Sequence, residues 1–367
     1  MTSSTTPARP AAGPAARHRR LPIGALRLPG PGRTLSVRWD PRATAVGALL
    51  ALAAAAVGVW TLTTGDFHVP VSDVLKVLAG EHVPGADYIV GELRLPRLLT
   101  ALLVGAALGL SGALFQTIAR NPLGSPDVIG FTVGSATGAL VTILVLGAGA
   151  ASVAVGSVIG CAVTSAAVWL LAWRGGAAGY RLILVGIGVS SLLTAANSYL
   201  IARASFNDAQ SAQVWLTGSL NGRGWEHVWT MVATLAVLGP AAVLLGRPLR
   251  MLEMGEDTAA ALGVPVRRVT SGALAVGVGL TALSTAVAGP VPFVALVAPQ
   301  VVRRLTRATG PNLLASTVMG ALLLSLSDIA AQRMLAPTQL PVGVLTGVVG
   351  GCYLVWVLAR QWRSGQG

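Results

Sequence analysis

Residues that could carry out chemistry are scarce in this chain of 367 residues, and they do not form a catalytic set. A phosphate-binding loop needs a lysine after its glycines, but the only lysine, Lys76, follows the run Ser-Asp-Val-Leu. No serine, cysteine or histidine can be assembled with a base into a nucleophile, and no paired His and Glu ligands suggest a metal. We therefore predict that the chain is not an enzyme and that it binds no cofactor or metal of its own.

Ion-driven transport is the other chemistry to consider, because it usually needs ionisable side chains inside the membrane. Asp328 is the one acid that falls well within an apolar stretch, and Asp127 lies at the edge of another. Arg333 follows Asp328 by five residues, a spacing that does not place two side chains well on one helix face. An ion-coupled secondary transporter therefore remains a distant alternative, and its transport would depend on Asp328.

The composition is that of an integral membrane protein. Hydrophobic residues make up 53% of the chain, charged residues make up 11%, and the mean hydropathy is +0.71. The net charge of +13 could indicate a nucleic-acid partner, but every basic residue except Lys76 is an arginine, and most lie in the tails and in alternate loops. We predict an all-α protein in a lipid bilayer, with no nucleic-acid partner.

Runs with few charges divide the chain into candidate membrane spans. The charge-free run 98–119 would be about 33 Å long as a helix, enough for a bilayer core of about 30 Å. Charge-poor runs predict about ten transmembrane helices: 43–64, 97–119, 127–148, 150–173, 181–202, 227–246, 269–288, 291–306, 312–332 and 340–360. The run 291–306 contains Pro292 and Pro299, so we expect a half-length or kinked helix there.

The arginines predict the orientation. If the N-terminus is cytoplasmic and all ten spans cross, 20 basic residues fall inside and six outside, in agreement with the positive-inside rule. Both termini would then be cytoplasmic. Residues 1–42 would form a disordered basic tail, 43–361 the transmembrane domain and 362–367 the C-terminal tail.

The stretch 94–138 has the most distinctive spacing in the chain. Two apolar spans flank a polar hinge, RNPLGSP at 120–126, where Asn121 and Pro122 should interrupt the helix. The second span carries a glycine at every fourth position, namely Gly130, Gly134 and Gly138. Such a stripe would let another helix approach closely.

The one substantial cytoplasmic loop is 247–268, in which Gly255 and Gly263 punctuate two short helical turns over about 249–265. Its apolar stripe consists of Leu249, Leu252, Ala259 and Leu262. The loop could be a solvated connector or a pair of short helices that docks on a soluble partner.

Six motifs, in this order, resemble the FecCD-type permeases, the membrane subunits of ABC importers for ferric siderophores, haem and cobalamin. They are LRLPR (93–97), GAALGLSGALFQ (105–116), RNPLGSPDVIGF (120–131), LEMGEDTAAALGV (252–264), AGPVPFVALVAP (288–299) and QLPVGVLTGVVGG (339–351). The resemblance extends from about 44 to 360 and is strongest to members that import ferric enterobactin.

The resemblance implies a type II ABC importer architecture in a bacterial cytoplasmic membrane. The expected partners are a second, related permease subunit in a heterodimer, two ATPase subunits that use ATP and Mg, and an extracytoplasmic siderophore-binding protein. The expected cargo is a ferric siderophore of the catecholate class. The same architecture importing haem or cobalamin is the alternative.

The resemblance also implies three groups of site residues. The ATPase-coupling residues are Leu252, Gly255, Glu256, Ala259, Leu262 and Gly263; the binding-protein docking residues are Arg94, Arg97 and Arg333; the pathway and hinge residues are Asn121, Pro122, Gly130, Gly134, Gly138, Pro299 and Gln300. The chain departs from the family pattern with Gln300 where many members have His and with Gln339 where Glu is common. An outer arginine of some relatives falls nearest Gln332, one place before Arg333.

Overall fold

The computed structural model describes two compact units, Met1–Pro41 and Arg42–Gly367. The residues that it describes are 24–28, 35–39, 41–65, 67–172, 179–308, 310–335 and 338–363.

The first unit contains a two-stranded antiparallel hairpin that the sequence did not indicate. Strand β1 (Gly24–Leu28) pairs with β2 (Leu35–Trp39), with Gly24 opposite Trp39. The other residues of the predicted disordered tail, apart from the start of the first helix, lie outside those described.

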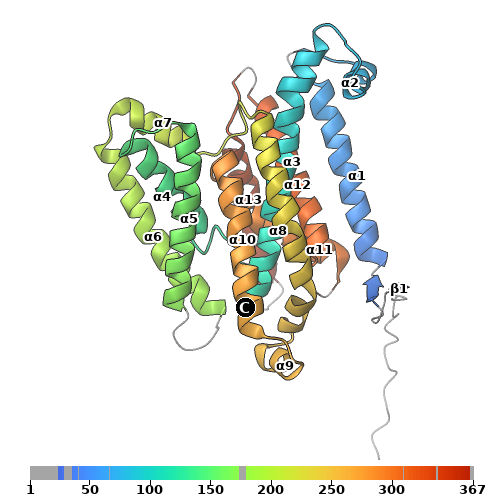
Figure 1. The fold of residues 1–367 in the computed structure, drawn as a ribbon, viewed down its shortest axis with the longest axis vertical. Helices are drawn as coiled ribbons and strands as arrows, with labels where there is room; N and C mark the ends of the chain where they lie inside the picture. Colours follow the sequence, from blue (N-terminus) through green and yellow to red (C-terminus); the bar gives the residue numbers. More distant parts are fainter. Residues whose placement is uncertain are drawn as a thin grey trace, which may run out of the picture. The chain divides into compact units, whose positions relative to one another are not determined.

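The second unit is helical, as the composition predicts, and its described residues contain no strand (Figure 1). Its elements are α1 (Pro41–Thr63), α2 (Val71–Leu78), η1 (Asp87–Arg94), α3 (Leu95–Ala119), α4 (Phe131–Leu144), α5 (Ala150–Ala172), α6 (Gly179–Arg203), α7 (Phe206–Leu216), α8 (Trp225–Leu252), α9 (Glu256–Ala261), α10 (Val266–Ala288), α11 (Val294–Thr306), α12 (Leu313–Arg333) and α13 (Val342–Arg363).

Fewer helices than predicted are long enough to span a membrane. In the described part of the chain seven helices meet this criterion by length and composition, and Phe131–Leu144 and Val342–Val357 are shorter apolar helices. The predicted span 127–148 is helical over only 14 residues because non-helical backbone precedes it, and α11 has 13 residues, as the prolines around it predict. The count of about ten spans is therefore not confirmed.

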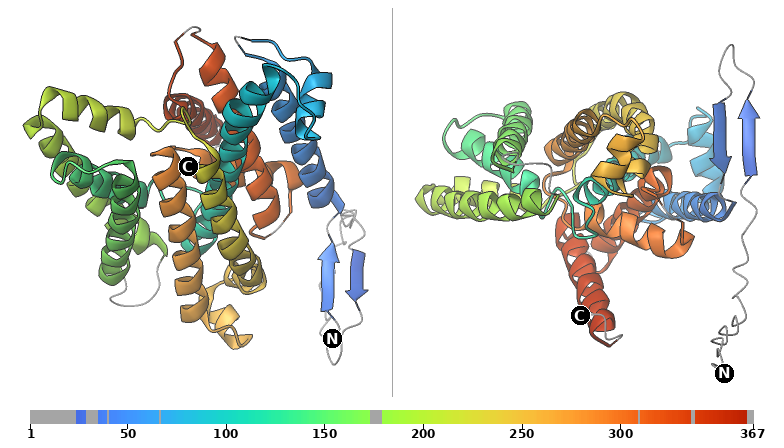
Figure 2. Two further views of the ribbon diagram at one scale, coloured as in Figure 1. Left: turned by 45° about the horizontal axis from the view of Figure 1, so that its top comes forward. Right: turned by 90° about the horizontal axis from the view of Figure 1, so that it is seen from below.

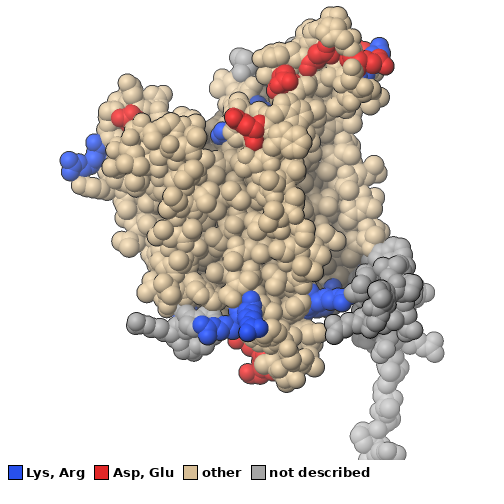
Figure 3. Space-filling view, viewed as in Figure 1, with Lys and Arg blue, Asp and Glu red and all other residues tan. Residues whose placement is uncertain are grey.

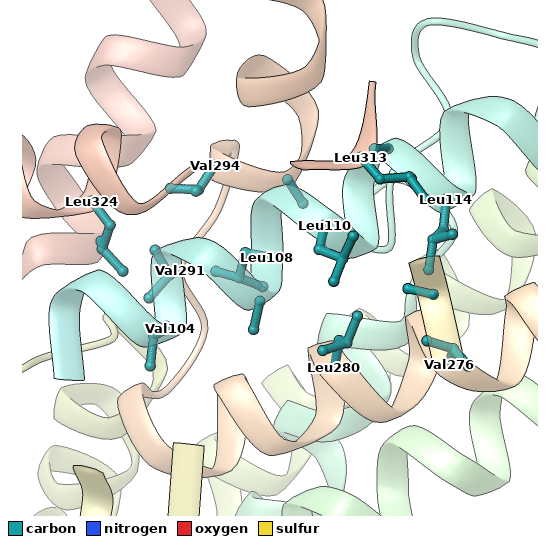
Figure 4. Packing of buried hydrophobic residues seen from close by; sticks show 14 of the residues in the cluster. Val104, Leu108, Leu110, Leu114, Val276, Leu280, Val291, Val294, Leu313 and Leu324 are labelled. Atoms are coloured by element: carbon teal, nitrogen blue, oxygen red, sulfur yellow. The ribbon is translucent and has the colours of Figure 1, made fainter. Parts of the chain in front are cut away.

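Helix α3 lies at the centre of the bundle, with α8, α10, α11 and α12 around it (Figure 1, Figure 2). In its most apolar window 83% of residues are buried, against 22% for α6. Figure 4 shows Val104, Leu108 and Leu114 of α3 among Leu280 of α10 and Leu324 of α12. Since lipid is as apolar as these side chains, close packing rather than exclusion from water holds them together.

The contact between α3 and α12 is made backbone to backbone. A Cβ atom at Gly105 would overlap the carbonyl oxygen of Gly320, and one at Gly109 would overlap the carbonyl oxygen of Ser316. Glycine at these positions is therefore required by the approach of the two helices.

The predicted glycine stripe is correct in part. Gly134 and Gly138 of α4 face α5, where Cβ atoms would overlap Thr164 and the Gly156 carbonyl. Gly130 does not share this face, because it precedes the helix with φ of 90° and packs against Gly186 of α6. The sequence placed it in the helix because its period of four fits, but its left-handed backbone ends the hinge instead.

Candidate functional site

Two stretches of non-helical backbone meet inside the bundle, one before α4 and one before α11. The carboxylate of Asp127 joins them: its Oδ1 accepts a hydrogen bond from the Thr132 hydroxyl at 2.6 Å, and its Oδ2 accepts one from the Phe293 amide at 3.2 Å. Phe293 has a left-handed backbone, with φ of 68°, directly before α11. Asp127 therefore satisfies an amide that no helix serves, as backbone at membrane depth requires.

The hinge is also tied to α11 by polar side chains. Gln300 Nε2 donates to the carbonyl oxygen of Pro122 at 2.9 Å. Asn121 closes the turn itself, because its Oδ1 accepts from the Leu123 amide at 2.9 Å. The structure thus brings Asn121 and Pro122 close to Gln300. The family resemblance had grouped these three residues in the transport pathway, but it gave no geometry for them.

At the opposite end of α3, Arg97 and Asp328 form a buried ion pair. Arg97 Nε and Nη2 donate to the carboxylate oxygens at 3.0 and 2.9 Å, and the two side chains are 15% and 2% exposed. Gln332 Nε2 donates to the same carboxylate at 2.7 Å, and Arg97 Nη1 donates to Gln339 Oε1 at 3.0 Å. The sequence identified Asp328 as the intramembrane acid but could not identify its partner, which lies 231 residues earlier.

The three arginines predicted to dock a binding protein differ in their surroundings. Arg97 is held by Asp328, and Arg94 is half-buried and donates to the carbonyl oxygens of Leu62, at 2.7 Å, and Phe67. Only Arg333 has an exposed side chain. Arg94 and Arg97, which the predicted orientation places on the outer side, thus have hydrogen-bond partners within this chain.

The predicted coupling loop forms α9 and the connections around it. Gly255 and Gly263 have φ of 111° and 82° and turn the chain at either side of α9. The predicted apolar stripe mostly faces inward, since Leu249, Leu252 and Ala259 are buried in the core of the bundle. Leu262 alone of the four is exposed, so the stripe as predicted is not an outer surface.

Two methionines that the sequence interpretation did not single out complete the exposed apolar surface of this loop. Met254 and Leu262 are 59% and 58% exposed, and Met251 is 38% exposed. Methionine is flexible and polarizable, and it is common on surfaces that adapt to a partner. Their occurrence in a loop between two apolar spans was the signal that could have identified them.

The two glutamates of the loop are paired with arginines of other helices. Glu256 Oε1 lies 3.0 Å from Arg120 Nη2, and Glu253 Oε1 lies 3.3 Å from Arg303 Nη2. Burial raises the pKa of Glu253, and the positive charges of Arg303 and Arg250 oppose that shift. Each of the two glutamates therefore has an ion-pair partner within this chain.

Charge is distributed unevenly between the two ends of the bundle. On the face drawn in Figure 3, lysine and arginine gather at the end that carries α9, and most acids lie at the end that carries α2. This is the asymmetry on which the predicted orientation depends.

Helix α6 presents a polar face that the sequence interpretation overlooked. Ser191, Thr194 and Ser198 are exposed, and each hydroxyl donates to the carbonyl four residues earlier. The side-chain oxygen of Asn197 is buried and has no hydrogen-bond partner in the described part of the chain. The spacing of these residues over one helix face was visible in the sequence.

The described residues form a helical bundle in which seven helices are long and apolar enough to cross a membrane, so the fold is that of a helical membrane protein. The FecCD transport family matches residues 43–360, and the chain belongs to this family. The resemblance inferred from the six motifs is thereby confirmed.

Known proteins support this assignment along nearly their whole length. The chain is 45% identical over 316 residues to the ferric enterobactin transport system permease protein FepG of Escherichia coli, covering 86% of this chain and 96% of that protein. It is 34% identical to the achromobactin transport system permease protein CbrC of Dickeya dadantii, covering 87% and 93%. A solved inward-facing conformation of a metal-chelate type ABC transporter superposes with a TM-score of 0.77 at 28% identity, covering 86% and 99%.

Proposed function

We propose that this chain is one permease subunit of an ATP-driven ABC importer that carries a ferric siderophore of the catecholate class across the bacterial cytoplasmic membrane. The observation that supports it best is the 45% identity to a ferric enterobactin permease over almost the full length of both chains. The match in fold to a metal-chelate type ABC transporter supports the same class.

The sequence offers no phosphate-binding loop with its lysine, so in this proposal the energy for transport comes from partner ATPases. The exposed surface of Met251, Met254 and Leu262 around α9 suits an apolar groove on such a subunit. Gly255 and Gly263 give α9 its position at the end of the bundle. ATP and Mg are bound by the two ATPase subunits, and their closure moves α9.

A second permease subunit completes the pathway. A siderophore is too large to pass through the packed core of one bundle, and the exposed hydroxyls of α6 (Ser191, Thr194 and Ser198) are suited to line a water-filled space between two subunits. The related partner expected from the family makes this pair a heterodimer. Both termini are cytoplasmic, and the α2 end faces the extracytoplasmic binding protein, with Arg333 as its exposed arginine.

Ion-coupled transport is not favoured by the surroundings of Asp328. A carboxylate that exchanges protons or sodium must be able to lose its partner, whereas Asp328 is 2% exposed and accepts hydrogen bonds from Arg97 and Gln332. The same architecture carrying haem or cobalamin, the alternative, is not favoured, because relatives such as FepG and CbrC are named for the transport of siderophores.

Growth on single iron sources tests the proposal. The gene is deleted, and a catecholate, a hydroxamate or a carboxylate siderophore, or haem, is supplied as the sole iron source. We expect growth to be lost on the catecholate alone and restored by the gene. Loss on another siderophore would keep the importer and refute the catecholate assignment, and growth on every source in a strain without redundant importers would refute iron transport.

A further inference from the structure

We propose that Glu253 and Glu256 act inside this chain as positioning residues, which tie the connection between α8 and α9 to the inner ends of α11 and α3. Movement of α9 then reaches both helices through ion pairs rather than through apolar packing alone. The inference rests on the proposed function, since it assumes that a partner moves α9. It gives the two acids a role other than contact with that partner.

The first ion pair joins α9 to the end of α3. Arg120 follows α3 with φ of 48°, a left-handed backbone that ends the helix and begins the hinge. Its Nη2 donates to Oε1 of Glu256, the first residue of α9, at 3.0 Å. The pair therefore connects the start of the α9 helix to the residue at which α3 gives way to the hinge.

The second ion pair joins the end of α8 to the last turn of α11. Arg303 Nη2 donates to Oε1 of Glu253, the residue directly after α8, at 3.3 Å. Glu253 and Glu256 are three residues apart, so a short connection is held at both of its ends by different helices. Asp257 follows directly and is exposed, with no ion pair in the described chain.

The two helices that receive these pairs are themselves fastened together near the hinge. A Cβ atom at Gly112 of α3 would overlap the carbonyl oxygen of Ala295 in α11. Gln116 Nε2 of α3 donates to the carbonyl oxygen of Leu296 at 2.9 Å. Because α3 and α11 are in such close contact, a displacement of the α8–α9 connection acts on them as a pair.

The partial exposure of the two ion pairs suits a role in transmitting the movement of α9 better than a role in stabilising the fold. The side chains of Arg120 and Glu256 are 41% and 31% exposed, and those of Arg303 and Glu253 are 34% and 25% exposed. Pairs of this exposure add little to folding stability, because water and salt screen them. They can still favour one position of α9 over another, and their loss should leave the fold intact.

A charge exchange distinguishes this role from contact with an ATPase. Arg120→Glu and Glu256→Arg are made singly and together in the full chain, assembled with its second permease and ATPases in lipid nanodiscs or liposomes. We expect each single change to lower uptake of ferric enterobactin per ATP hydrolysed by about two- to five-fold, and the double change to restore it. A glutamate that contacted only the ATPase would not be rescued by a change at Arg120.

Asp257 provides the matched control. Asp257→Arg reverses the charge one residue away, and combining it with Arg120→Glu should give no rescue. If the reversed variants fail to accumulate, Arg120→Gln and Glu256→Gln replace them, and the double neutral variant should be no worse than either single one. Independent, additive losses in either set would overturn the proposal. A wild-type complex that hydrolyses ATP without taking up ferric enterobactin would instead contradict the assignment of that cargo, and the same double-mutant cycle can then be read from ATP hydrolysis.

Discussion

The two ends of α3 carry arginines in opposite circumstances. At the N-terminal end of α3, Arg97 is 15% exposed and donates to both carboxylate oxygens of Asp328, with Gln332 on the same carboxylate. Directly after the C-terminal end of α3, Arg120 is 41% exposed and makes one contact with Glu256. One helix thus ends in a buried multidentate pair on one side of the bundle and in a single, partly solvated pair on the other.

The difference indicates which end can move. A buried pair is strongly destabilising to break, because each charge is left without a partner in a medium of low dielectric constant. A half-exposed pair can separate and regain water, so breaking it changes the free energy little. The N-terminal half of α3, which is also in backbone contact with α12, is expected to be rigid, and the C-terminal end is expected to adjust to α9.

The largest effect should follow from Asp328→Ala. Removing this carboxylate leaves the buried guanidinium of Arg97 unpaired and should lower the free energy of unfolding by about 3–5 kcal/mol. Chemical unfolding of the purified complex in mixed micelles measures it. The double variant Arg97→Met with Asp328→Leu should recover most of the lost stability. An Asp328→Ala variant as stable as wild type would show that the ion pair does not stabilise the N-terminal end of α3.

An intermediate effect is expected from Gly109→Ala. The added methyl group would overlap the Ser316 carbonyl, so α3 and α12 must separate, with a loss of about 1–3 kcal/mol in the free energy of unfolding. Gly47→Ala in α1 is the matched control, because a Cβ atom there meets nothing within 4 Å. This control should be neutral or slightly stabilising. Equal unfolding curves for the two variants would contradict the close approach.

The smallest effect should come from Glu253→Gln, and it should depend on pH. Burial raises the pKa of Glu253, so the folded chain binds the proton more tightly than the unfolded chain does. Its wild-type contribution to stability is therefore present at low pH and lost as pH rises from the ordinary glutamate value through the raised one. The glutamine variant lacks this loss and should be more stable at pH 7 by less than about 1 kcal/mol. Thermal unfolding at pH 4 and pH 7 checks it, and a variant less stable at pH 7 would reverse the assignment.

Sequence patterns predicted what depends on local spacing. The charge-free run around α3, the shortness of α11 beside its prolines and the α4 positions of Gly134 and Gly138 follow from neighbouring residues and were correct. The motifs also identified the family, because their order extends over nearly the whole chain.

Predictions from the sequence failed where they depended on the direction in which a helix face points, or on contacts between residues that are distant in sequence. Leu249, Leu252 and Ala259 have the right spacing for a stripe, but spacing alone does not say which side of the stripe faces the chain's own core. The partners of Asp328 and Glu256 lie far away in sequence, and one sequence without relatives cannot bring them together. Gly130 was misplaced because a period of four fits both a helix and the residue that begins one.

The half-length helices have a consequence for how the protein enters the membrane. Helices α4 and α11, with 14 and 13 residues, are about 21 and 20 Å long, well short of a bilayer core of about 30 Å. Alone in lipid, α11 would leave the amide of Phe293 without the Asp127 carboxylate that accepts its hydrogen bond here. We expect isolated α4 or α11 segments to fail in a translocon insertion assay, and stable independent insertion would contradict this. During synthesis we therefore expect α4 to enter the bilayer together with α5, its main packing partner, and α11 to enter together with α12 against α3.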